Sequence, residues 1–207
     1  KILIKDKKNG MVETNAFTMC LDWKGDLWIS GWDCGIFHYS IEESCFKNYL
    51  TDRGRPILQG RIHTIKAFEP NKIYIGSDQG LTLFDPSTQK YITTSYNRNN
   101  SSSLSDDFVY DILKDNEGGL WITTYFGGIN YSNPNSSNFT IRHCATESAR
   151  GRIISKFHED KNGDIFIGTD DGGLFIYNPI KDKCHRYTID KSNPNLNIHA
   201  IWSNDTS

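Results

Sequence analysis

Four short segments of this sequence place aromatic rings or acidic groups where they could bind a polar ligand. They are Trp32-Asp33, Asp78-Gln79, Tyr125-Phe126 and Asp170-Asp171. The C–H faces of a sugar stack on aromatic rings, and its hydroxyl groups need hydrogen-bond partners such as carboxylates and amides. We therefore take these eight residues as candidate ligand-binding residues, with an oligosaccharide as the expected partner.

Three of the four segments also have a structural interpretation. The rings of Trp32, Tyr125 and Phe126 could pack against neighbouring structural units or a partner domain. The aspartates of the first and last segments could act as turn residues whose side chains accept hydrogen bonds from nearby backbone N–H groups. The sequence leaves both interpretations open.

Catalytic chemistry has little support in the sequence. Glycoside hydrolysis needs two carboxylates about 5 to 9 Å apart, and Asp78 and Asp170 could in principle supply them. Nothing marks either residue as a tuned acid or base, and the sequence contains no nucleophile elbow, P-loop or dinucleotide-binding motif. We expect a binding module, with a protein-interaction or dimerisation scaffold as the alternative and a glycan-active enzyme as a weaker one.

Metal and cofactor sites are not expected either. The run Asp160-Lys161-Asn162-Gly163-Asp164 resembles the start of a calcium loop, but Ile165 stands where such a loop has its glycine. A hairpin turn explains this segment. The six histidines show no H-E-x-x-H spacing, so we predict no metal, no cofactor and no catalytic residue.

Composition narrows the range of partners and compartments. The 207 residues include 23 Lys and Arg against 25 Asp and Glu, and this balance disfavours nucleic acid or an anionic membrane as a partner. No apolar run is long enough for a membrane helix, so any targeting segment is expected outside this chain. The five cysteines have no C-x-x-C spacing, and we expect most to be small buried residues, although one pair could form a disulfide.

The elements that position the candidate residues recur along the chain. DWKGDLWISG, DNEGGLWITT and DKNGDIFIGT begin at Asp22, Asp115 and Asp160, and a degenerate copy, EPNKIYIGS, begins at Glu69. The aligned aromatic residues follow one another at intervals of 45 to 47 residues, and they are Trp28, Tyr74, Trp121 and Phe166. A period of this length with alternating apolar residues predicts the four-stranded blades of a β-propeller. Trp28 and Trp121, in the middle of repeated strands, are expected in the core.

One repeat can be divided into strands directly. The third copy predicts strands over 108–113, 120–124, 129–132 and 139–143, separated by turns at 115–119 and 126–128 and by Asn133-Pro134. The whole chain then becomes an all-β, partial β-propeller of about four four-stranded antiparallel blades. We predict a blade remnant at 1–16, blades at 17–59, 60–105, 106–150 and 151–197, and the start of another blade at 198–207. Because each blade packs on the next, we expect further blades of a longer chain, or a second copy in a homodimer, to complete the arc.

The repeat resembles a known family. The pattern D-x-x-G-x-L-W-I-G-T-x-x-G-G-L-x-x-Y-D-P followed by L-S-x-x-x-V-x-x-I is similar to the two-component regulator propeller repeat. Asp115–Pro134 and Asp160–Pro179 match it well, and the run from Leu104 to Ile112 matches its linker. The resemblance implies a periplasmic sensor region of an inner-membrane receptor of the Bacteroidetes hybrid two-component type, with histidine kinase modules elsewhere and an oligosaccharide as ligand.

Overall fold

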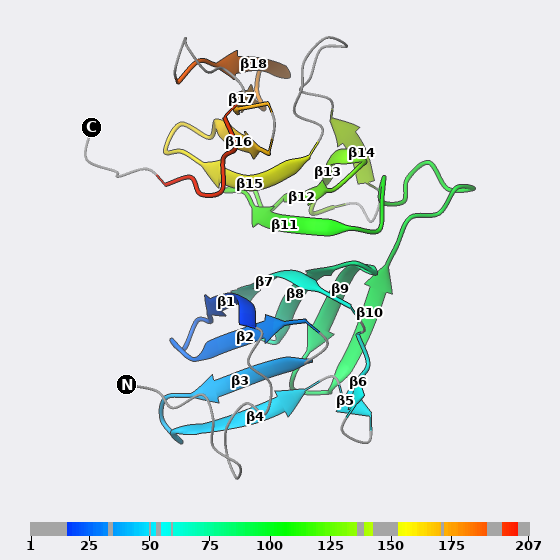
Figure 1. Ribbon diagram of the computed structural model, residues 1–207, viewed down its shortest axis with the longest axis vertical. Coiled ribbons are helices and arrows are strands. Elements are labelled where there is room, and N and C mark those ends of the chain that lie inside the picture. Colours follow the sequence, from blue (N-terminus) through cyan, green and yellow to red (C-terminus); the bar gives the residue numbers. More distant parts are fainter. Residues whose placement is uncertain are drawn as a thin grey trace. The chain divides into compact units, whose positions relative to one another are not determined.

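The computed structural model describes residues 16–32, 35–49, 51–52, 55–58, 60–135, 139–142, 153–170, 172–189 and 196–202. The described residues are all-β, with no helix among them, and none forms a helix long and apolar enough to cross a membrane. They build four antiparallel four-stranded sheets and one short two-stranded hairpin (Figure 1). The chain divides into two compact units, Lys1–Ser95 and Tyr96–Ser207.

The first unit contains two blades and the hairpin. Its first sheet consists of β1 (Ala16–Leu21), β2 (Leu27–Gly31), β3 (Ile36–Ser40) and β4 (Cys45–Tyr49). The hairpin consists of β5 (Thr51–Asp52) and β6 (Arg55–Pro56). The second sheet consists of β7 (Ile62–Glu69), β8 (Lys72–Ser77), β9 (Gly80–Asp85) and β10 (Lys90–Thr94).

The second unit contains the other two blades. Its first sheet consists of β11 (Val109–Lys114), β12 (Leu120–Thr124), β13 (Gly128–Ser132) and β14 (Phe139–Arg142). Its second sheet consists of β15 (Ile154–Glu159), β16 (Ile165–Thr169), β17 (Leu174–Asn178) and β18 (Lys183–Tyr187). Strands in every four-stranded sheet follow chain order, each paired antiparallel with the next. The predicted all-β fold of about four four-stranded blades is confirmed.

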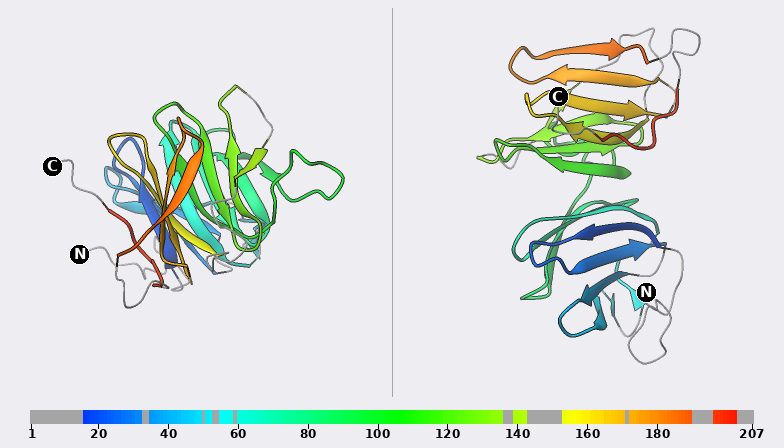
Figure 2. Two further views of the ribbon diagram at one scale, coloured as in Figure 1. Left: turned by 90° about the horizontal axis from the view of Figure 1, so that it is seen from above. Right: turned by 90° about the vertical axis from the view of Figure 1, so that its left-hand side faces the viewer.

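Within each unit the sheets pack face to face through their first strands. β1 lies beside β7 in the first unit, and β11 beside β15 in the second (Figures 1 and 2). Because successive side chains of a strand point to opposite faces of the sheet, every second side chain lies in the space between the sheets, and these positions are mostly apolar. The core of the first unit comprises Trp28, Ile36, Leu58, Ile62, Ile65, Ile73, Ile75 and Phe84. The core of the second comprises Trp121, Ile129, Ile154, Phe157, Ile165, Ile167, Phe175 and Tyr177.

The aligned tryptophans occupy the core positions that the repeat predicts. Trp28 and Trp121 are each 2% exposed, and both lie in the second strand of their blade. The strands predicted for the third repeat agree with β11 to β14 to within one residue at each end.

The end of the described chain runs alongside the fourth blade. Residues 196–202 belong to no strand, although a further strand was expected from residue 198. Ile198 N donates to Thr169 O at 2.8 Å, and the side chain of Ile198 lies over Gly168. The predicted remnant at 1–16 falls outside the described residues except for Ala16, which begins β1.

Candidate functional site

The aspartate that opens the D-x-x-G motif organises the turn between the first two strands of a blade. In the third blade, Asp115 Oδ1 accepts hydrogen bonds from the backbone N–H groups of Glu117 at 3.1 Å and Gly119 at 2.6 Å. Its Oδ2 accepts from the indole Nε1 of Trp121 at 2.8 Å. A single carboxylate thus closes the turn and satisfies the polar atom of a buried tryptophan, which explains why Asp and Trp occur together in the motif.

The same geometry recurs in the other complete copies of the motif. Asp22 accepts from the backbone of Lys24 and Asp26 and from the indole of Trp28, and Asp160 accepts from the backbone of Asn162 and Asp164. The motif glycines have positive φ angles of 80° to 86°, and they are Gly25, Gly118 and Gly163. The calcium-like run at 160–164 is therefore a hairpin turn whose first aspartate is engaged within the turn.

The degenerate second copy makes this turn by another route. Glu69 pairs with Lys72 across a two-residue turn, and Asn71 takes the left-handed conformation with φ of 58°. A salt bridge of 2.7 Å joins the side chains of Glu69 and Lys72. A shorter turn of this kind needs neither the motif aspartate nor its glycine.

A second recurring contact fixes the turns that carry the candidate binding residues. In the second, third and fourth blades, the residue after the second strand donates its backbone N–H to the carbonyl of the residue before the first strand. The donor and acceptor pairs are Asp78 and Arg61 at 3.1 Å, Tyr125 and Phe108 at 2.9 Å, and Asp170 and Ile153 at 3.0 Å. We call these three hydrogen bonds the turn clamps.

In the first unit the structure brings Trp32 and Asp78 together through Arg61. Trp32 forms an isolated β-bridge with Arg61, whose guanidinium lies 5.0 Å from the Trp32 ring and 4.7 Å from the Phe17 ring. Asp78 Oδ2 accepts from Arg61 N at 3.1 Å, and its Oδ1 lies 2.6 Å from Nε2 of His63. Both oxygens of Asp78 thus have protein partners.

The other predicted residues of this unit contribute less. Gln79 is exposed, and its backbone N–H donates to Ser77 Oγ at 3.2 Å. Asp33 lies outside the described residues. The ring of Trp32 is half exposed at 49%, so one side of it remains open while the other meets Arg61.

In the second unit the turn between β12 and β13 carries a cluster of aromatic side chains. Phe126 is 74% exposed, and its ring meets those of Tyr125 at 4.4 Å and Phe108 at 6.4 Å between centroids. Tyr125 also contacts Tyr110 at 5.4 Å. Asp106 Oδ2 accepts from the backbone N–H of Phe126 at 2.9 Å, which places a carboxylate beside the rings. We call Phe108, Tyr110, Tyr125 and Phe126 the aromatic platform.

Asp170 lies at the equivalent turn of the fourth blade. One of its carboxylate oxygens, Oδ1, is buried without a hydrogen bond and lies 3.8 Å from Nδ1 of the exposed His199. Asp171 lies outside the described residues. Asp78 and Asp170, the carboxylates considered for glycoside hydrolysis, belong to different compact units.

Sequence reasoning did not identify a pocket at the opposite ends of the strands in the second unit. It has a volume of about 370 Å³ and lies between the β11–β12 and β15–β16 turns, with Tyr131, Glu159, Asn162 and Asn178 among its lining residues. Glu159 accepts from Asn116 Nδ2 at 3.1 Å. Burial raises the pKa of Glu159 above its ordinary value. The residues that line the pocket belong to repeated strands and turns, so the sequence did not distinguish them from residues that only maintain the fold.

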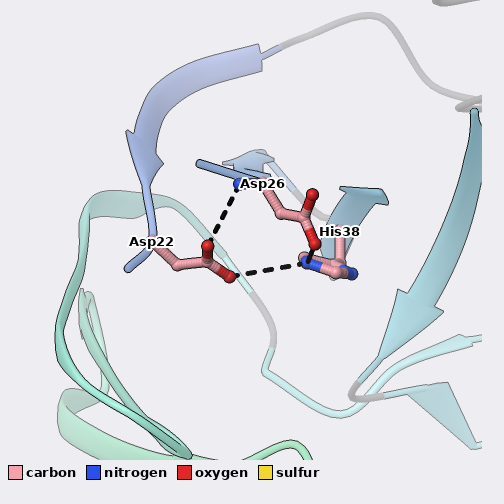
Figure 3. Close-up of side chains that lie close together, drawn as sticks. All are labelled: Asp22, Asp26 and His38. Atoms are coloured by element: carbon pink, nitrogen blue, oxygen red, sulfur yellow. Dashed lines mark hydrogen bonds and ion pairs between the residues drawn. The ribbon is translucent and has the colours of Figure 1, made fainter. Parts of the chain in front are cut away.

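A second group that the sequence analysis missed lies in the first blade. Asp22, Asp26 and His38 bring two carboxylates and an imidazole together, and their ligand atoms lie within 4.8 Å of one another (Figure 3). His38 Nε2 is 3.5 Å from Asp26 Oδ2 and 3.7 Å from Asp22 Oδ2. His38 is on β3 and reaches the turn because it pairs with Trp28 across the sheet. Aligning the repeats would have revealed it, since His38 takes the place of Tyr131 in the third blade.

The described cysteines differ in state. Cys184 is disulfide-bonded, whereas Cys20 and Cys45 are free thiols. Burial raises the pKa of Cys20 to about 11, and a hydrogen bond to Glu43 raises the pKa of Cys45. A disulfide was left open by the sequence, and its presence is typical of proteins from oxidising compartments.

Comparisons with known proteins agree on the fold. Residues 103–126 match the family described as Two component regulator propeller. The extracellular domain assigned to the hybrid two component system BT3049 of B. thetaiotaomicron superposes with a TM-score of 0.74 at 21% identity, covering 89% of this chain and 26% of that one. The extracellular domain assigned to BT4673 of the same organism gives a TM-score of 0.67 at 19% identity over 85% of this chain and 25% of that one.

A third solved structure with this fold belongs to another system. PorZ, a surface component of the type-IX secretion system of Porphyromonas gingivalis, gives a TM-score of 0.69 at 16% identity over 93% of this chain and 30% of that one. No curated protein sequence matches the chain. The chain spans between a quarter and a third of the length of these structures. It has the propeller-type fold of these domains, and its residues 103–126 match one two-component regulator propeller repeat.

Proposed function

We propose that this chain is part of the ligand-sensing region of a hybrid two-component receptor and that its ligand is an oligosaccharide. The matched repeat and the fold of the extracellular domains support the sensor role. The disulfide of Cys184 supports a location outside the cytoplasm, in the periplasm of a cell whose inner membrane holds the receptor. Histidine kinase modules of the same receptor would carry out the phosphoryl chemistry.

The observation that carries the ligand class is the aromatic platform. Phe126 is 74% exposed to solvent and Phe108 is 41% exposed, although an exposed aromatic ring does not contribute to the hydrophobic core. The two rings meet edge to face with an interplanar angle of 85°, so a ligand could contact the face of one ring and the edge of the other. Asp106 and Tyr125 add polar atoms beside the rings, and this combination suits a pyranose that stacks and hydrogen-bonds at once.

A bound oligosaccharide would act on the receptor through the packing of its chains. The platform lies on a turn whose backbone is tied to the start of the blade by the turn clamp from Tyr125 to Phe108. A ligand that contacts the turn and a second receptor chain would favour one arrangement of the pair over another. In this proposal the energy of signalling is the difference in ligand affinity between the two arrangements.

Calorimetric titration of an oligosaccharide panel into the complete extracytoplasmic region tests the proposal. We expect saturable binding without release of product, and a loss of affinity of about fivefold or more in Phe126→Ala, because stacking on an aromatic ring contributes on the order of 1 kcal/mol or more. Tyr91→Ala is the matched control, since Tyr91 is an aromatic residue on β10 with 41% exposure and lies outside the platform.

The possible results distinguish a wrong site assignment from a wrong ligand class. Binding that survives in Phe126→Ala but is lost in Glu159→Gln would move the site to the pocket at the opposite strand ends. No binding by any member of the panel would contradict the oligosaccharide as ligand.

One observation favours a protein-interaction scaffold as the second candidate. Phe17, Met19 and Leu21 alternate along β1 and are 54%, 66% and 65% exposed. Such a row suits contact with protein, either another blade or a second copy in a homodimer. Sedimentation of the same region, with Met19→Glu as the variant, would reveal an association that depends on this row.

A further inference from the structure

The geometry points to a divalent metal site of the zinc class in the first blade, formed by Asp22 Oδ2, Asp26 Oδ2 and His38 Nε2. The two carboxylates come from the β1–β2 turn and the imidazole from β3, and all three side chains converge on one point (Figure 3). The repeat motif accounts for Asp22 but not for His38, and the proposed sensing of an oligosaccharide requires none of the three residues, so the site is independent of the proposed function.

The spacing of the three ligand atoms fits a metal better than a hydrogen-bonded cluster. His38 Nε2 is 3.5 Å from Asp26 Oδ2 and 3.7 Å from Asp22 Oδ2, whereas N–H···O hydrogen bonds are about 2.7 to 3.2 Å long. With metal–ligand bonds of about 2.0 to 2.2 Å, as zinc makes to imidazole and carboxylate, tetrahedral ligand atoms lie about 3.4 Å apart. The two separations that involve His38 are close to the edges of such a tetrahedron, and all three ligand atoms lie within 4.8 Å of one another.

Both carboxylates are held in place by contacts that leave at least one lone pair of the metal-facing oxygen available. Asp22 is oriented by the backbone N–H groups of Lys24 and Asp26 at Oδ1, while the indole of Trp28 takes one of the two lone pairs of Oδ2. Asp26 Oδ1 accepts from Ile41 N at 2.9 Å, which turns Oδ2 toward His38. Outer contacts of this kind are typical of metal sites in proteins.

The imidazole is positioned by aromatic packing. The His38 ring lies 4.4 Å from the Trp28 ring between centroids, and 6.4 Å from the Tyr49 ring. Because the ring is fixed from the side, its Nε2 edge faces the two carboxylates. The side chains are 3%, 13% and 17% exposed for Asp22, Asp26 and His38, so the group is largely desolvated yet has an opening at the histidine.

The fourth blade provides an internal comparison. It keeps both aspartates of the turn, Asp160 and Asp164, but Ile176 occupies the place of His38, as the pairing of Phe166 with Ile176 shows. There Asp164 accepts from Asn178 Nδ2, whereas Ser40 stands at that position in the first blade. The paired aspartates alone therefore belong to the turn. The first blade adds the imidazole and replaces the amide donor by Ser40, whose Oγ accepts from Glu43 N at 3.3 Å.

The donor set selects the class of ion. Calcium takes six to eight oxygen ligands, whereas one imidazole nitrogen with two carboxylate oxygens suits zinc and its neighbours among the transition metals. Three protein ligands leave a fourth position of the tetrahedron for water or for a group of a bound partner. The two negative carboxylates in a largely desolvated place are neutralised by a divalent cation.

Zinc chloride titration into tag-free chain, followed by calorimetry, tests the site. We expect one zinc ion per chain and an X-ray absorption spectrum at the zinc edge with nitrogen and oxygen neighbours that include one imidazole. His38→Gln is expected to weaken binding at least about tenfold, as is Asp26→Asn, which keeps the size of the side chain and so guards against a loss caused by misfolding. Circular dichroism of each variant verifies that the sheets are retained.

Two matched control variants test whether zinc binding depends on Asp22, Asp26 and His38 in particular. His185→Gln removes an exposed imidazole on β18, and Asp164→Asn removes the equivalent carboxylate of the fourth blade. Both should bind zinc as the unaltered chain does. Absence of saturable zinc binding, equal affinity in folded His38→Gln or Asp26→Asn, or an equal loss in Asp164→Asn would each overturn the assignment.

Discussion

Replacing Asp115 with alanine tests how much one carboxylate contributes to a blade. The substitution removes the acceptor for two backbone N–H groups of the turn and for the indole N–H of Trp121. Because Trp121 is 2% exposed, water cannot take over the indole hydrogen bond without opening the core. The lost bond is one to a charged group and buried, so it should account for about 1.5 to 3 kcal/mol of local stability.

Asp160 offers a matched measurement of the turn alone. Asp160→Ala removes the equivalent backbone contacts, to Asn162 and Asp164, but the fourth blade has Phe166 in place of tryptophan and so loses no indole bond. We expect this variant to cost about 1 kcal/mol, as for the loss of ordinary hydrogen bonds near the surface. The difference between the two variants estimates the contribution of the indole bond.

The assay must report on one blade, because the chain forms two compact units. Native-state amide hydrogen exchange of β12 for Asp115→Ala, and of β16 for Asp160→Ala, gives the free energy of opening for the strand that follows each turn. A double-mutant cycle with Trp121→Phe then measures the coupling between the carboxylate and the indole. Coupling below about 0.5 kcal/mol, or equal losses in Asp115→Ala and Asp160→Ala, would refute the reasoning that the motif joins Asp to Trp through this bond.

Three further outcomes are expected. Gly127→Ala should destabilise the second unit by about 1 to 3 kcal/mol in urea unfolding, because its new Cβ would lie 2.6 Å from Ser105 Cβ, and an unchanged midpoint would contradict this. In the native chain at pH 8, a thiol reagent should modify Cys45 well before Cys20, whose pKa is raised to about 11, and mass spectrometry of the labelled peptides measures the order. The Cys20 thiol stays protonated in the folded state up to about pH 11, whereas in the unfolded chain it ionises from about pH 9. The free energy of unfolding should therefore fall between pH 9 and 11, and this fall should be smaller in Cys20→Ala.

The sequence was sufficient for the blades because their information is local. Alternating apolar residues and turn glycines determine each strand, and the spacing of the aligned aromatic residues relates one blade to the next, so β12 could be placed at its observed bounds. The β5–β6 hairpin was not predicted, since two-residue strands carry no periodic pattern. Asp33 and Asp171 remain predictions outside the described residues.

The candidate sites were predicted less completely because they depend on pairing across strands. Tyr125 and Phe126 are adjacent in the sequence and were identified together, whereas Phe108 joins them only through the turn clamp and an edge-to-face contact. His38 is a lone histidine in the sequence and gains its aspartate neighbours from the register that places it opposite Trp28. Ring partners and ligand groups of this kind follow from register, which short-range patterns do not encode.

The turn clamps have a consequence for how such a repeat can diversify. Each clamp joins a backbone N–H to a backbone carbonyl, so it is made equally well by the aspartate at position 78, the tyrosine at 125 and the aspartate at 170. Substitutions at these turns change the chemistry shown to solvent while the main chain beneath them keeps its path. Lineages that share the fold can therefore exchange one recognition surface for another by single amino-acid changes, whereas an insertion between clamp and strand would shift the turn itself.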